Sequence, residues 1–297
     1  MNIAVLSRNP ALYSTQSLVQ AARKRYHYVR VIDYVYCDLV IDHQHPKVLY
    51  NGQELQNIDA IIPRIGAGYT SHGASLIRQF EGLGVYSSLS SNALVEARNK
   101  LHCLQILASH GILVPKSVVS NNTLFFDHII HNLESEKVVI KLLNGTHGLG
   151  VVLAHDHKQA FSIMEAFTKS KSKVFFQEFI KEAQGADIRV FIVNGKIQGT
   201  MKRQAEPGEF RSNLHRGGTA TIVDITDEEA EIAVRSANIL GLKVAGVDML
   251  RSQRGPMILE VNASPGLEGI ETTTRSDIAG EIIEMIEKDI ENIKNES

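Results

Sequence analysis

The sequence predicts a mixed α/β protein, with an N-terminal domain built on a mainly parallel sheet and α+β units after it. Strand-like and helix-like segments alternate through the first third of the chain, which is typical of β-α-β units and a twisted parallel sheet. Later strand-like runs come in pairs separated by short turns. Asn194-Gly195, between two such runs, is a strong signal for a type I′ hairpin.

In the first third, apolar runs predict strands at residues 2–7, 28–34 and 59–65, with an edge segment at 48–50. A helix is expected from Ser14, acting as its N-cap, to about Tyr26, and a second helix over residues 71–82. The Ser-rich stretch SSLSSN at residues 87–92 marks a domain boundary, so the first domain is predicted to span residues 1–92.

The rest of the chain is predicted to form two units, residues 93–185 and 186–297. The first unit is expected to hold one helix over 93–110 with Gly111 as C-cap, strands at 138–143, 151–154 and 173–180, and a helix near 157–168. The second is expected to hold strands at 187–193, 196–203 and 219–225, two more within 246–269, and helices at 227–240 and 276–293.

Composition narrows the class of protein. With 297 residues, 43% of them hydrophobic, the chain can bury a large core in one to three units. A formal net charge of −2 argues against a general nucleic-acid binder. Cys37 and Cys103 cannot form a disulfide framework and favour a reducing compartment. With no signal-peptide pattern and no apolar run long enough to cross a bilayer, we expect a soluble cytoplasmic protein with no membrane partner.

Three oxygen-bearing side chains interrupt the apolar runs of residues 246–269. Asp248 lies near the end of one run, and Glu260 and Asn262 lie two apart on the next, hence on one face of a strand. If the runs pair, these oxygens converge, which suits a hard cation such as Mg²⁺ bound with substrate phosphates. The alternative is that the carboxylates form surface pairs with Arg251 or Arg254, which their apolar sequence context disfavours.

The segment KLLNGTHGLG at residues 141–150 is a candidate phosphate loop. Gly145, Gly148 and Gly150 allow a tight turn that exposes backbone N–H groups to an anion, although neither the Walker A nor the dinucleotide glycine pattern is matched. An ordinary hairpin loop explains the glycines equally well. Lys141 favours the phosphate interpretation, because a lysine within the apolar run VVIKLL needs an anionic partner.

Three further groups of polar residues each allow two interpretations, as ligand contacts or as part of a solvated surface. Glu178 and Phe179 lie at a strand end that could read an adenine edge, or the glutamate could simply be solvated. Asp187 and Arg189 share one face of a strand, as a surface ion pair or as ligand contacts. The basic stretch of residues 202–216 could be a solvated face, or could neutralise a transferring phosphoryl group. It contains the basic residues Lys202, Arg203, Arg211, His215 and Arg216, together with Ser212 and Asn213.

The order of these features resembles the ATP-grasp superfamily of carboxylate–amine ligases. More closely, FRSNLHRGG (210–218), AGVDML (245–250) and EVNASPGLEGIE (260–271) are similar to the RimK family of glutamate ligases. PRIG (63–66) and RQFE (78–81) extend the resemblance to nearly the whole chain. His147 stands where other members have Gln, and residues 201–202 also differ. Neither change removes a nucleotide or metal ligand, so both bear on the tuning of the protein more than on its activity.

The resemblance implies a fold and a set of roles. The fold would be a pre-ATP-grasp domain followed by two subdomains that clasp ATP. Lys100 and Lys141 would contact the ATP phosphates, Glu178 and Phe179 the adenine, Asp187 the nucleoside, and Arg211, Ser212 and Asn213 the phosphates. Asp248, Glu260 and Asn262 would hold two Mg²⁺ or Mn²⁺ ions, with Glu260 bridging them.

The resemblance also implies a reaction. An acceptor carboxylate would take the γ-phosphoryl group of ATP, Arg211 would neutralise charge in that transfer, and the amine of L-glutamate would then displace phosphate. The 145–150 hairpin would be a lid. Family members add glutamates to the C-terminus of a small-subunit ribosomal protein, the sixth, some also join free glutamates into α-linked chains, and a tetramer is expected.

Two alternatives stay open: a sibling ligase with another amino acid or a small-molecule acceptor, and a catalytically silent ATP-binding regulator. The site that binds glutamate is also open. Arg64, Arg203 and Arg216 are the candidates to meet its carboxylates.

Overall fold

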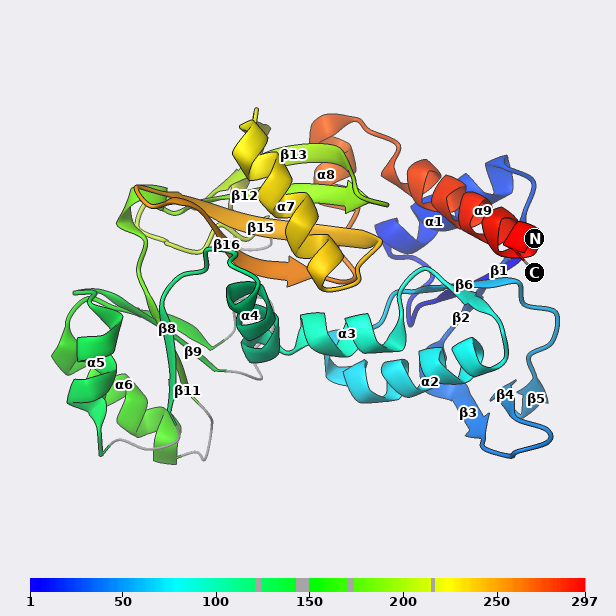
Figure 1. Cartoon of the computed structure of the whole chain (residues 1–297), viewed down its shortest axis with the longest axis horizontal. Helices are drawn as coiled ribbons and strands as arrows, with labels where there is room; N and C mark the ends of the chain where they lie inside the picture. The colour runs from blue at the N-terminus through cyan, green and yellow to red at the C-terminus, as the bar shows by residue number, and fades with distance from the viewer. Residues whose placement is uncertain (121–123, 143–149, 170–173, 215–216, 297) are drawn as a thin grey trace.

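A computed structural model describes residues 1–120, 124–142, 150–169, 174–214 and 217–296. The chain forms an N-terminal α/β part, a small central α+β part and a larger C-terminal part (Figure 1). The main sheet of the N-terminal part is parallel, with strand order β2-β1-β6-β7, which confirms the predicted sheet type. Its strands are β1 (Asn2–Leu6), β2 (Tyr28–Ile32), β6 (Ala60–Pro63) and β7 (Tyr86–Ser87).

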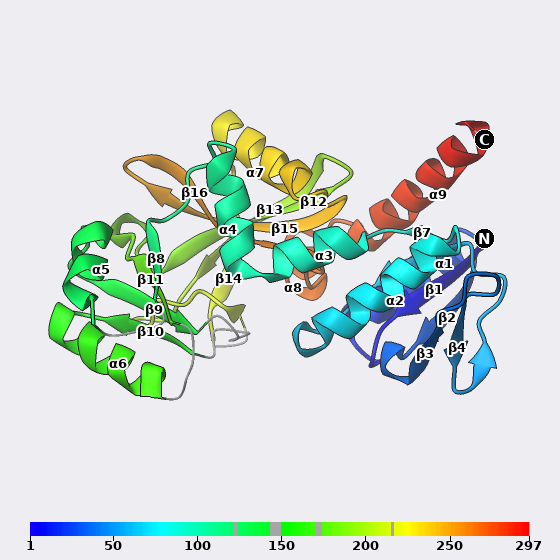
Figure 2. The same ribbon diagram turned by 60° about the horizontal axis from the view of Figure 1, so that its bottom comes forward.

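Two helices, α1 (Tyr13–Lys24) and α2 (Thr70–Gly82), connect these strands (Figure 2). A separate antiparallel sheet is formed by β3 (Cys37–Val40), β4 (Lys47–Tyr50) and β5 (Gln53–Glu54), in that order. The segment at 48–50 therefore lies in the middle strand of this small sheet rather than at an edge of the main sheet. The predicted N-cap is also wrong. Leu12 caps α1 without a side-chain bond, while the Ser14 hydroxyl accepts a hydrogen bond from the Leu267 amide at 2.9 Å.

The helix expected over residues 93–110 is two helices, α3 (Ser91–Arg98) and α4 (Lys100–Ser109). Asn99 separates them because its side chain accepts hydrogen bonds from the amides of Leu101 and His102, which starts a new helix. Gly111 follows α4 with φ +74°, as expected for a residue at a helix C-terminus.

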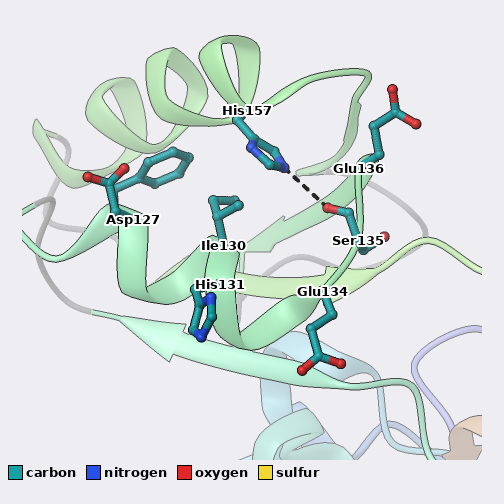
Figure 3. Close-up of a pocket in the computed structure, with 8 residues that line it drawn as sticks. Asp127, Ile130, His131, Glu134, Ser135, Glu136 and His157 are labelled. Carbon is teal, nitrogen blue, oxygen red and sulfur yellow. Dashed lines mark hydrogen bonds between the residues drawn. The ribbon is translucent and has the colours of Figure 1, made fainter.

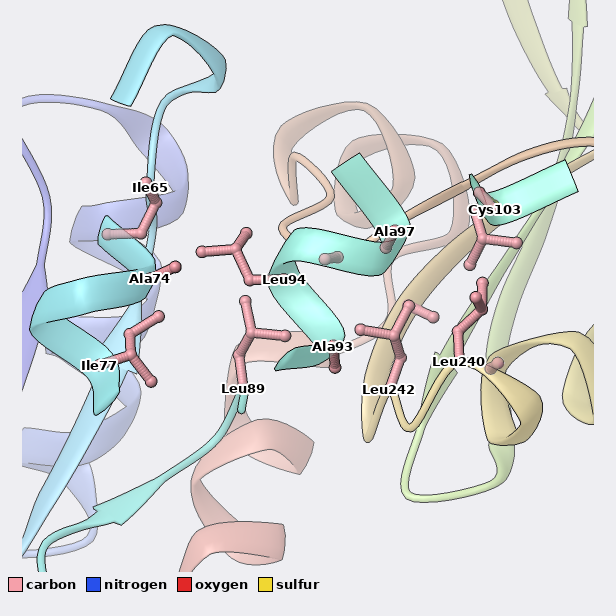
Figure 4. Close-up of a cluster of buried hydrophobic side chains, with 14 of the residues drawn as sticks. Ile65, Ala74, Ile77, Leu89, Ala93, Leu94, Ala97, Cys103, Leu240 and Leu242 are labelled. Carbon is pink, nitrogen blue, oxygen red and sulfur yellow. The ribbon is translucent and has the colours of Figure 1, made fainter. Parts of the chain in front are cut away.

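Helix α3 joins the N-terminal and C-terminal parts through one continuous apolar core (Figure 4). Leu94 and Ala97 of α3 are buried against Ile77 of α2 on one side and Leu242 on the other. The proposed division into residues 1–92, 93–185 and 186–297 therefore separates units of the chain that share a core. This packing holds the carboxyl ends of β1 and β6 next to the C-terminal sheet.

The central part is a four-stranded antiparallel sheet of order β10-β9-β11-β8 with two helices (Figure 1). Its elements are β8 (Ser117–Ser120), α5 (Phe126–Leu133), β9 (Val138–Leu142), β10 (Val151–Ala154), α6 (His157–Lys169) and β11 (Val174–Glu178). Both helices pack over the sheet through an apolar cluster that includes Phe126, Met164 and Phe176. The predicted strand pair around the glycine segment is confirmed by the antiparallel pairing of β9 with β10.

The C-terminal part contains a five-stranded antiparallel sheet of order β14-β13-β12-β15-β16. Its elements are β12 (Ala186–Val193), β13 (Lys196–Gln204), β14 (Thr219–Ile222), α7 (Asp227–Ile239), β15 (Val244–Ser252), β16 (Gly255–Asn262), α8 (Glu268–Thr274) and α9 (Ile278–Glu296). Asn194 and Gly195 both have positive φ, so the hairpin prediction is confirmed. None of the helices that the structure describes is long and apolar enough to span a membrane.

The two faces of this sheet differ in character. Ile188, Val190 and Val247 lie in the core that includes the buried side chains of α7. On the opposite face, Phe191 and Val193 pack with α8 and α9. Asp187 and Arg189, which alternate with Phe191 along β12, also lie on this second face.

The loop after β16 packs tightly on β15 at Gly246. A Cβ atom at this position would lie 2.8 Å from the Cβ of Pro265, closer than real contacts allow. Glycine therefore lets the loop that follows Asn262 rest directly on the strand that carries Asp248.

We predict that Gly246→Ala destabilises the protein by about 1–3 kcal/mol, because the added methyl group overpacks this contact. Thermal unfolding measures the effect. Gly266→Ala is the matched control, since a Cβ there meets nothing within 4 Å. Equal melting temperatures for the two variants would show that the loop does not pack on β15 in this way.

Candidate functional site

A buried network of four charged side chains lies on the polar face of the C-terminal sheet. Arg189 donates to both carboxylate oxygens of Asp248, from Nε to Oδ1 and from Nη2 to Oδ2, each at 2.6 Å. Arg203 donates from Nε to Oδ1 of Asp187 at 2.7 Å, and its Nη2 lies 2.9 Å from Oδ2 of Asp248. The two arginines and two aspartates balance in charge.

Strand register places these side chains together. Asp187 is opposite Arg203 on β13, and Arg189 is opposite Asp248 on β15. Asp248 is 1% exposed, and burial by itself raises the pKa of its carboxyl group. The charges of Arg189 and Arg203 outweigh burial and bring that pKa down to about 2, so the carboxylate stays ionised. Neither aspartate is a surface group, and Asp187 does not pair with Arg189.

Two β-bulges set this register. In β12–β13 the pairing shifts between Phe191 and Ile192, and without the shift Asp187 would face Lys202 instead of Arg203. In β15–β16 a second shift follows Asp248, which brings Glu260 directly opposite it. Because side chains alternate between faces, each one-residue shift moves a functional side chain onto the polar face.

Glu260 and Asn262 complete a set of oxygen ligands with Asp248. The Asn262 amide nitrogen lies 3.4 Å from Oδ2 of Asp248 and 3.3 Å from Oε1 of Glu260, so the three side chains converge as the sequence predicted. Two carboxylates and an amide oxygen fit Mg²⁺, which usually completes its coordination with waters and substrate phosphates. Among the described residues there is no cluster of three or more His, Cys, Asp or Glu side chains that could hold a metal.

Two lysines lie near these carboxylates. Lys141, on β9, donates from Nζ to Oε1 of the buried Gln177 at 2.7 Å. Burial lowers the pKa of Lys141 to about 8. The charge of Glu260 opposes this effect and that of Lys100, at the start of α4, adds to it. The central and C-terminal parts thus bring Lys141, Lys100 and the carboxylate of Glu260 within electrostatic reach of one another.

Glu178, the last residue of β11, is held by contacts with the central part and with the C-terminal part. Glu178 accepts a hydrogen bond from the Lys116 amide at 2.6 Å and pairs with Arg254 of the β15–β16 turn at 2.5 Å. The interpretation of Glu178 as merely solvated is therefore wrong. Phe179 follows in the half-buried connection between the central and C-terminal parts.

Arg211, Ser212 and Asn213 lie on the segment after β13. Arg211 forms a bidentate pair with Glu209 and donates from Nη1 to the Val151 carbonyl oxygen at 3.2 Å. Val151 begins β10, so Arg211 links the C-terminal part to the base of the glycine hairpin. Ser212 is buried, while Asn213 is partly exposed.

The structure separates the basic stretch into different environments. Lys202 is exposed and Arg203 is buried, while His215 and Arg216 lie outside the described residues. The glycines at 145 and 148, His147 and most of the predicted lid also lie outside them. Arg251 pairs with Glu229 rather than with either metal candidate. The alternative of surface pairs for Asp248 and Glu260 is thus excluded.

Sequence reasoning missed Arg189 and Arg203 as partners of Asp248. Arg189 shares a strand face with Asp187, and this spacing was a usable signal. The bulge that places Arg203 opposite Asp187 leaves no clear mark in the sequence. The pairing of Arg254 with Glu178 was missed because it joins segments far apart in the sequence, and the local pair of Glu209 with Arg211 was overlooked.

A cavity of about 570 Å³ lies elsewhere, on the central part between α5 and the start of α6 (Figure 3). Figure 3 shows the His157 ring, which donates to the Ser135 carbonyl oxygen at 3.4 Å, with Asp127, Ile130 and Glu136 around the space. None of the predicted site residues lines this cavity. The candidate site is therefore the polar face of the C-terminal sheet with the lysines of β9 and α4.

Two protein-family models match the chain. The RimK PreATP-grasp domain matches residues 1–94, and the RimK-like ATP-grasp domain matches residues 97–286. Curated relatives match over similar lengths. A probable alpha-L-glutamate ligase of Hydrogenovibrio crunogenus is 51% identical over 288 residues, 97% of this chain and 96% of its own. Probable alpha-L-glutamate ligase 1 of Hahella chejuensis is 52% identical, covering 97% and 95%.

Solved structures share the fold at low identity. The ATP-grasp ligase PsnB, complexed with a phosphomimetic variant of its minimal precursor, Mg and ADP, has a TM-score of 0.76 at 21% identity, covering 97% of this chain and 98% of that one. The RimK domain ATP-grasp protein from Sphaerobacter thermophilus has a TM-score of 0.72 at 19% identity, covering 96% and 99%. Family models and relatives together span nearly the entire sequence, and this chain belongs to the RimK family of ATP-grasp proteins.

Proposed function

We propose that this protein is an ATP-dependent ligase that adds L-glutamate to the C-terminus of a small-subunit ribosomal protein, the sixth. The observation that carries the proposal is the convergence of Asp248, Glu260 and Asn262 beside the charge of Lys141. Hard oxygen ligands next to a phosphate-binding cation suit a metal–nucleotide complex. The names of the curated relatives support glutamate as a substrate.

In this proposal ATP lies between the central and C-terminal parts. Lys100, Lys141, Arg211, Ser212 and Asn213 contact its phosphates, Glu178 and Phe179 border the adenine, and Asp187 helps hold the nucleoside. Asp248, Glu260 and Asn262 hold two Mg²⁺ or Mn²⁺ ions. When bound, the ions screen the phosphate charges and orient the γ-phosphoryl group.

The reaction has two steps. An oxygen of the acceptor carboxylate attacks the γ-phosphorus of ATP. The bond between the γ-phosphorus and the β–γ bridging oxygen breaks, and ADP leaves with the electron pair of that bond. The neutral amine of glutamate then attacks the acyl carbon of the acyl phosphate, inorganic phosphate leaves, and the nitrogen loses a proton to give an amide. Lys141 and Arg211 offset the negative charge that gathers on the phosphoryl oxygens.

An acyl phosphate hydrolyses readily, so water has to be excluded while it exists. Arg211 donates to the carbonyl oxygen of Val151, which directly follows the proposed lid in the chain. The same arginine would thereby couple phosphate binding to closure of the proposed lid at residues 145–150.

Family resemblance supports a cytoplasmic homotetramer.

The alternatives make different demands on the site. A sibling ligase would use the same ATP site with another amino acid or a small-molecule acceptor. A silent ATP-binding regulator would have no need for Asp248, Glu260 and Asn262 to converge in a charge-balanced, buried setting, which disfavours it.

Mass spectrometry tests the acceptor. After incubation with ATP, Mg²⁺ and glutamate, we predict a ladder of added glutamyl residues on the ribosomal protein. A version of the acceptor without its terminal carboxylate is the control, and it should stay unmodified. Glutamate-dependent phosphate release without the ladder would contradict this acceptor and favour a sibling ligase. Phosphate release indifferent to every amino acid would argue against ligation.

Glu260→Gln tests the metal site with little structural disturbance. Loss of one ligand charge is predicted to reduce ATP turnover by at least roughly 100-fold with an unchanged melting temperature, and the exposed Glu231→Gln is the control. Asp248→Ala is a harsher change, because it leaves Arg189 and Arg203 without a shared anion and should cost about 3–5 kcal/mol of stability. Wild-type turnover in Glu260→Gln would refute the assignment.

Lys141 makes nucleotide binding depend on pH. Its pKa in the ligand-free protein is about 8, and bound phosphate favours the charged form, so affinity for a non-hydrolysable ATP analogue should fall as the pH rises above 8. We predict a loss on the order of tenfold, measured by calorimetry, and little change for Lys141→Arg, which keeps its charge. An equal pH dependence in both proteins would contradict the role of Lys141.

The stability of the ligand-free protein should change in the opposite direction. The folded pKa of Lys141 lies below its unfolded value of 10.5, so the unfolded state binds more protons between about pH 8 and 10.5. In that window this residue contributes stability that increases with pH.

A further inference from the structure

Two arginines at the edge of the N-terminal parallel sheet have no acidic partner among the residues that the structure describes. Arg64 follows β6, and Arg98 is the last residue of α3. In the described part of the chain, neither guanidinium lies within the 4.0 Å ion-pair distance of a carboxylate. Each instead donates to a backbone carbonyl oxygen, Arg64 to Pro265 at 2.7 Å and Arg98 to Ile65 at 2.5 Å.

The surroundings of Arg64 and Arg98 disfavour the charged form of each guanidinium group. Burial, together with the nearby charge of Arg98, lowers the pKa of Arg64 to about 10. Burial likewise lowers the pKa of Arg98, and the groups that shift the two pKa values include no carboxylate. Carbonyl oxygens satisfy donors but do not neutralise charge, so two adjacent, partly buried cations favour an anionic ligand.

The topology of the sheet independently marks this position. In the order β2-β1-β6-β7, the chain leaves β1 for β2 on one side and reaches β6 on the other. The carboxyl ends of β1 and β6 therefore flank the switch point of the sheet, where ligands of open α/β folds bind. Arg64 lies there, since its amide donates to the Leu6 carbonyl oxygen at the end of β1. Arg8, also after β1, stacks on Tyr69 and adds a third cation at this edge.

The same position adjoins the proposed reaction centre. Pro265, which accepts the hydrogen bond from Arg64, lies three residues after Asn262 and packs against Gly246. The Nε atom of Arg189 lies 3.7 Å from where a Cβ of Gly246 would be, so the guanidinium that holds Asp248 adjoins the same glycine. One loop thus separates the arginine pair from the metal candidates.

The structure also narrows the candidates for binding a substrate carboxylate. Arg203 is 5% exposed and is engaged by Asp187 and Asp248. Arg216 lies outside the described residues. Of the described candidates, Arg64 is the one without a carboxylate partner, and Arg98, which the sequence did not suggest, lies beside it.

We propose that Arg64 and Arg98 bind a carboxylate group of the organic substrate at the carboxyl edge of the N-terminal sheet. This inference rests on the proposed ligase function. Two substrates carry the required group: free L-glutamate, and the C-terminal residue of the acceptor. Pairing with either would neutralise the two guanidinium groups and hold the reacting group beside the nucleotide.

Arg64→Gln and Arg98→Gln test the proposal, because glutamine can still donate to a carbonyl oxygen but carries no charge. Arg78→Gln is the matched control. It removes the same charge from an exposed arginine of this domain, which donates to Asn92. For each protein, KM is measured for glutamate, for a peptide ending in glutamate and for ATP. Calorimetry measures binding of glutamate and of the peptide in the presence of Mg²⁺ and a non-hydrolysable ATP analogue.

We expect each of the two variants to raise KM and Kd for one carboxylate substrate by roughly 10- to 100-fold, with KM for ATP and the control unchanged. An effect on glutamate alone identifies the entering amino acid as the ligand, and an effect on the peptide alone identifies the acceptor. Unchanged binding of both, or unfolding of both variants, would overturn the proposal. If the wild-type protein neither binds nor consumes glutamate, the proposed function itself fails, a result visible without any variant.

Discussion

The site depends on one buried carboxylate shared by two guanidinium groups. Asp248 is almost inaccessible to solvent, and a lone charge there would be strongly unfavourable. Arg189 and Arg203 make it tolerable, and Asp187 balances the second arginine. Such a network contributes little net stability compared with apolar packing, but its geometry is demanding. It holds the carboxylate of Asp248, the proposed metal ligand, ionised and in one orientation.

The other parts of the site are arranged around this network. Two bulges turn Arg203 and Glu260 onto the polar face, while α7 covers the apolar one. The central part brings Lys141 within electrostatic reach of Glu260. Helix α3 packs into both the N-terminal and C-terminal parts, so the carboxyl edge of the parallel sheet, with Arg64, meets the loop after β16 (Figure 4). Nucleotide, metal and carboxylate chemistry can thus meet along one short loop.

Much of this arrangement could be predicted from the sequence, because the signals were local. Alternating strands and helices identified the parallel sheet, Asn194-Gly195 identified a hairpin, and the spacing of Glu260 and Asn262 placed both beside Asp248. Contacts that depend on long-range register could not be predicted. A single-residue bulge decides whether Asp187 meets Lys202 or Arg203, and the sequence carries no clear mark of it. The division of one expected helix into two at Asn99 and the role of Ser14 as an acceptor for Leu267 likewise depended on tertiary contacts and local capping.

The most direct test of the account is a crystal structure with Mg²⁺ and a non-hydrolysable ATP analogue. We predict Mg²⁺ about 2.0–2.1 Å from oxygens of Asp248, Glu260 and Asn262. Arg189 and Arg203 should still be bonded to Asp248, and Lys141 should contact a phosphate oxygen. Coordination of the metal by other side chains, or an Asp248 released from both arginines, would contradict the claim that one buried carboxylate organises the site.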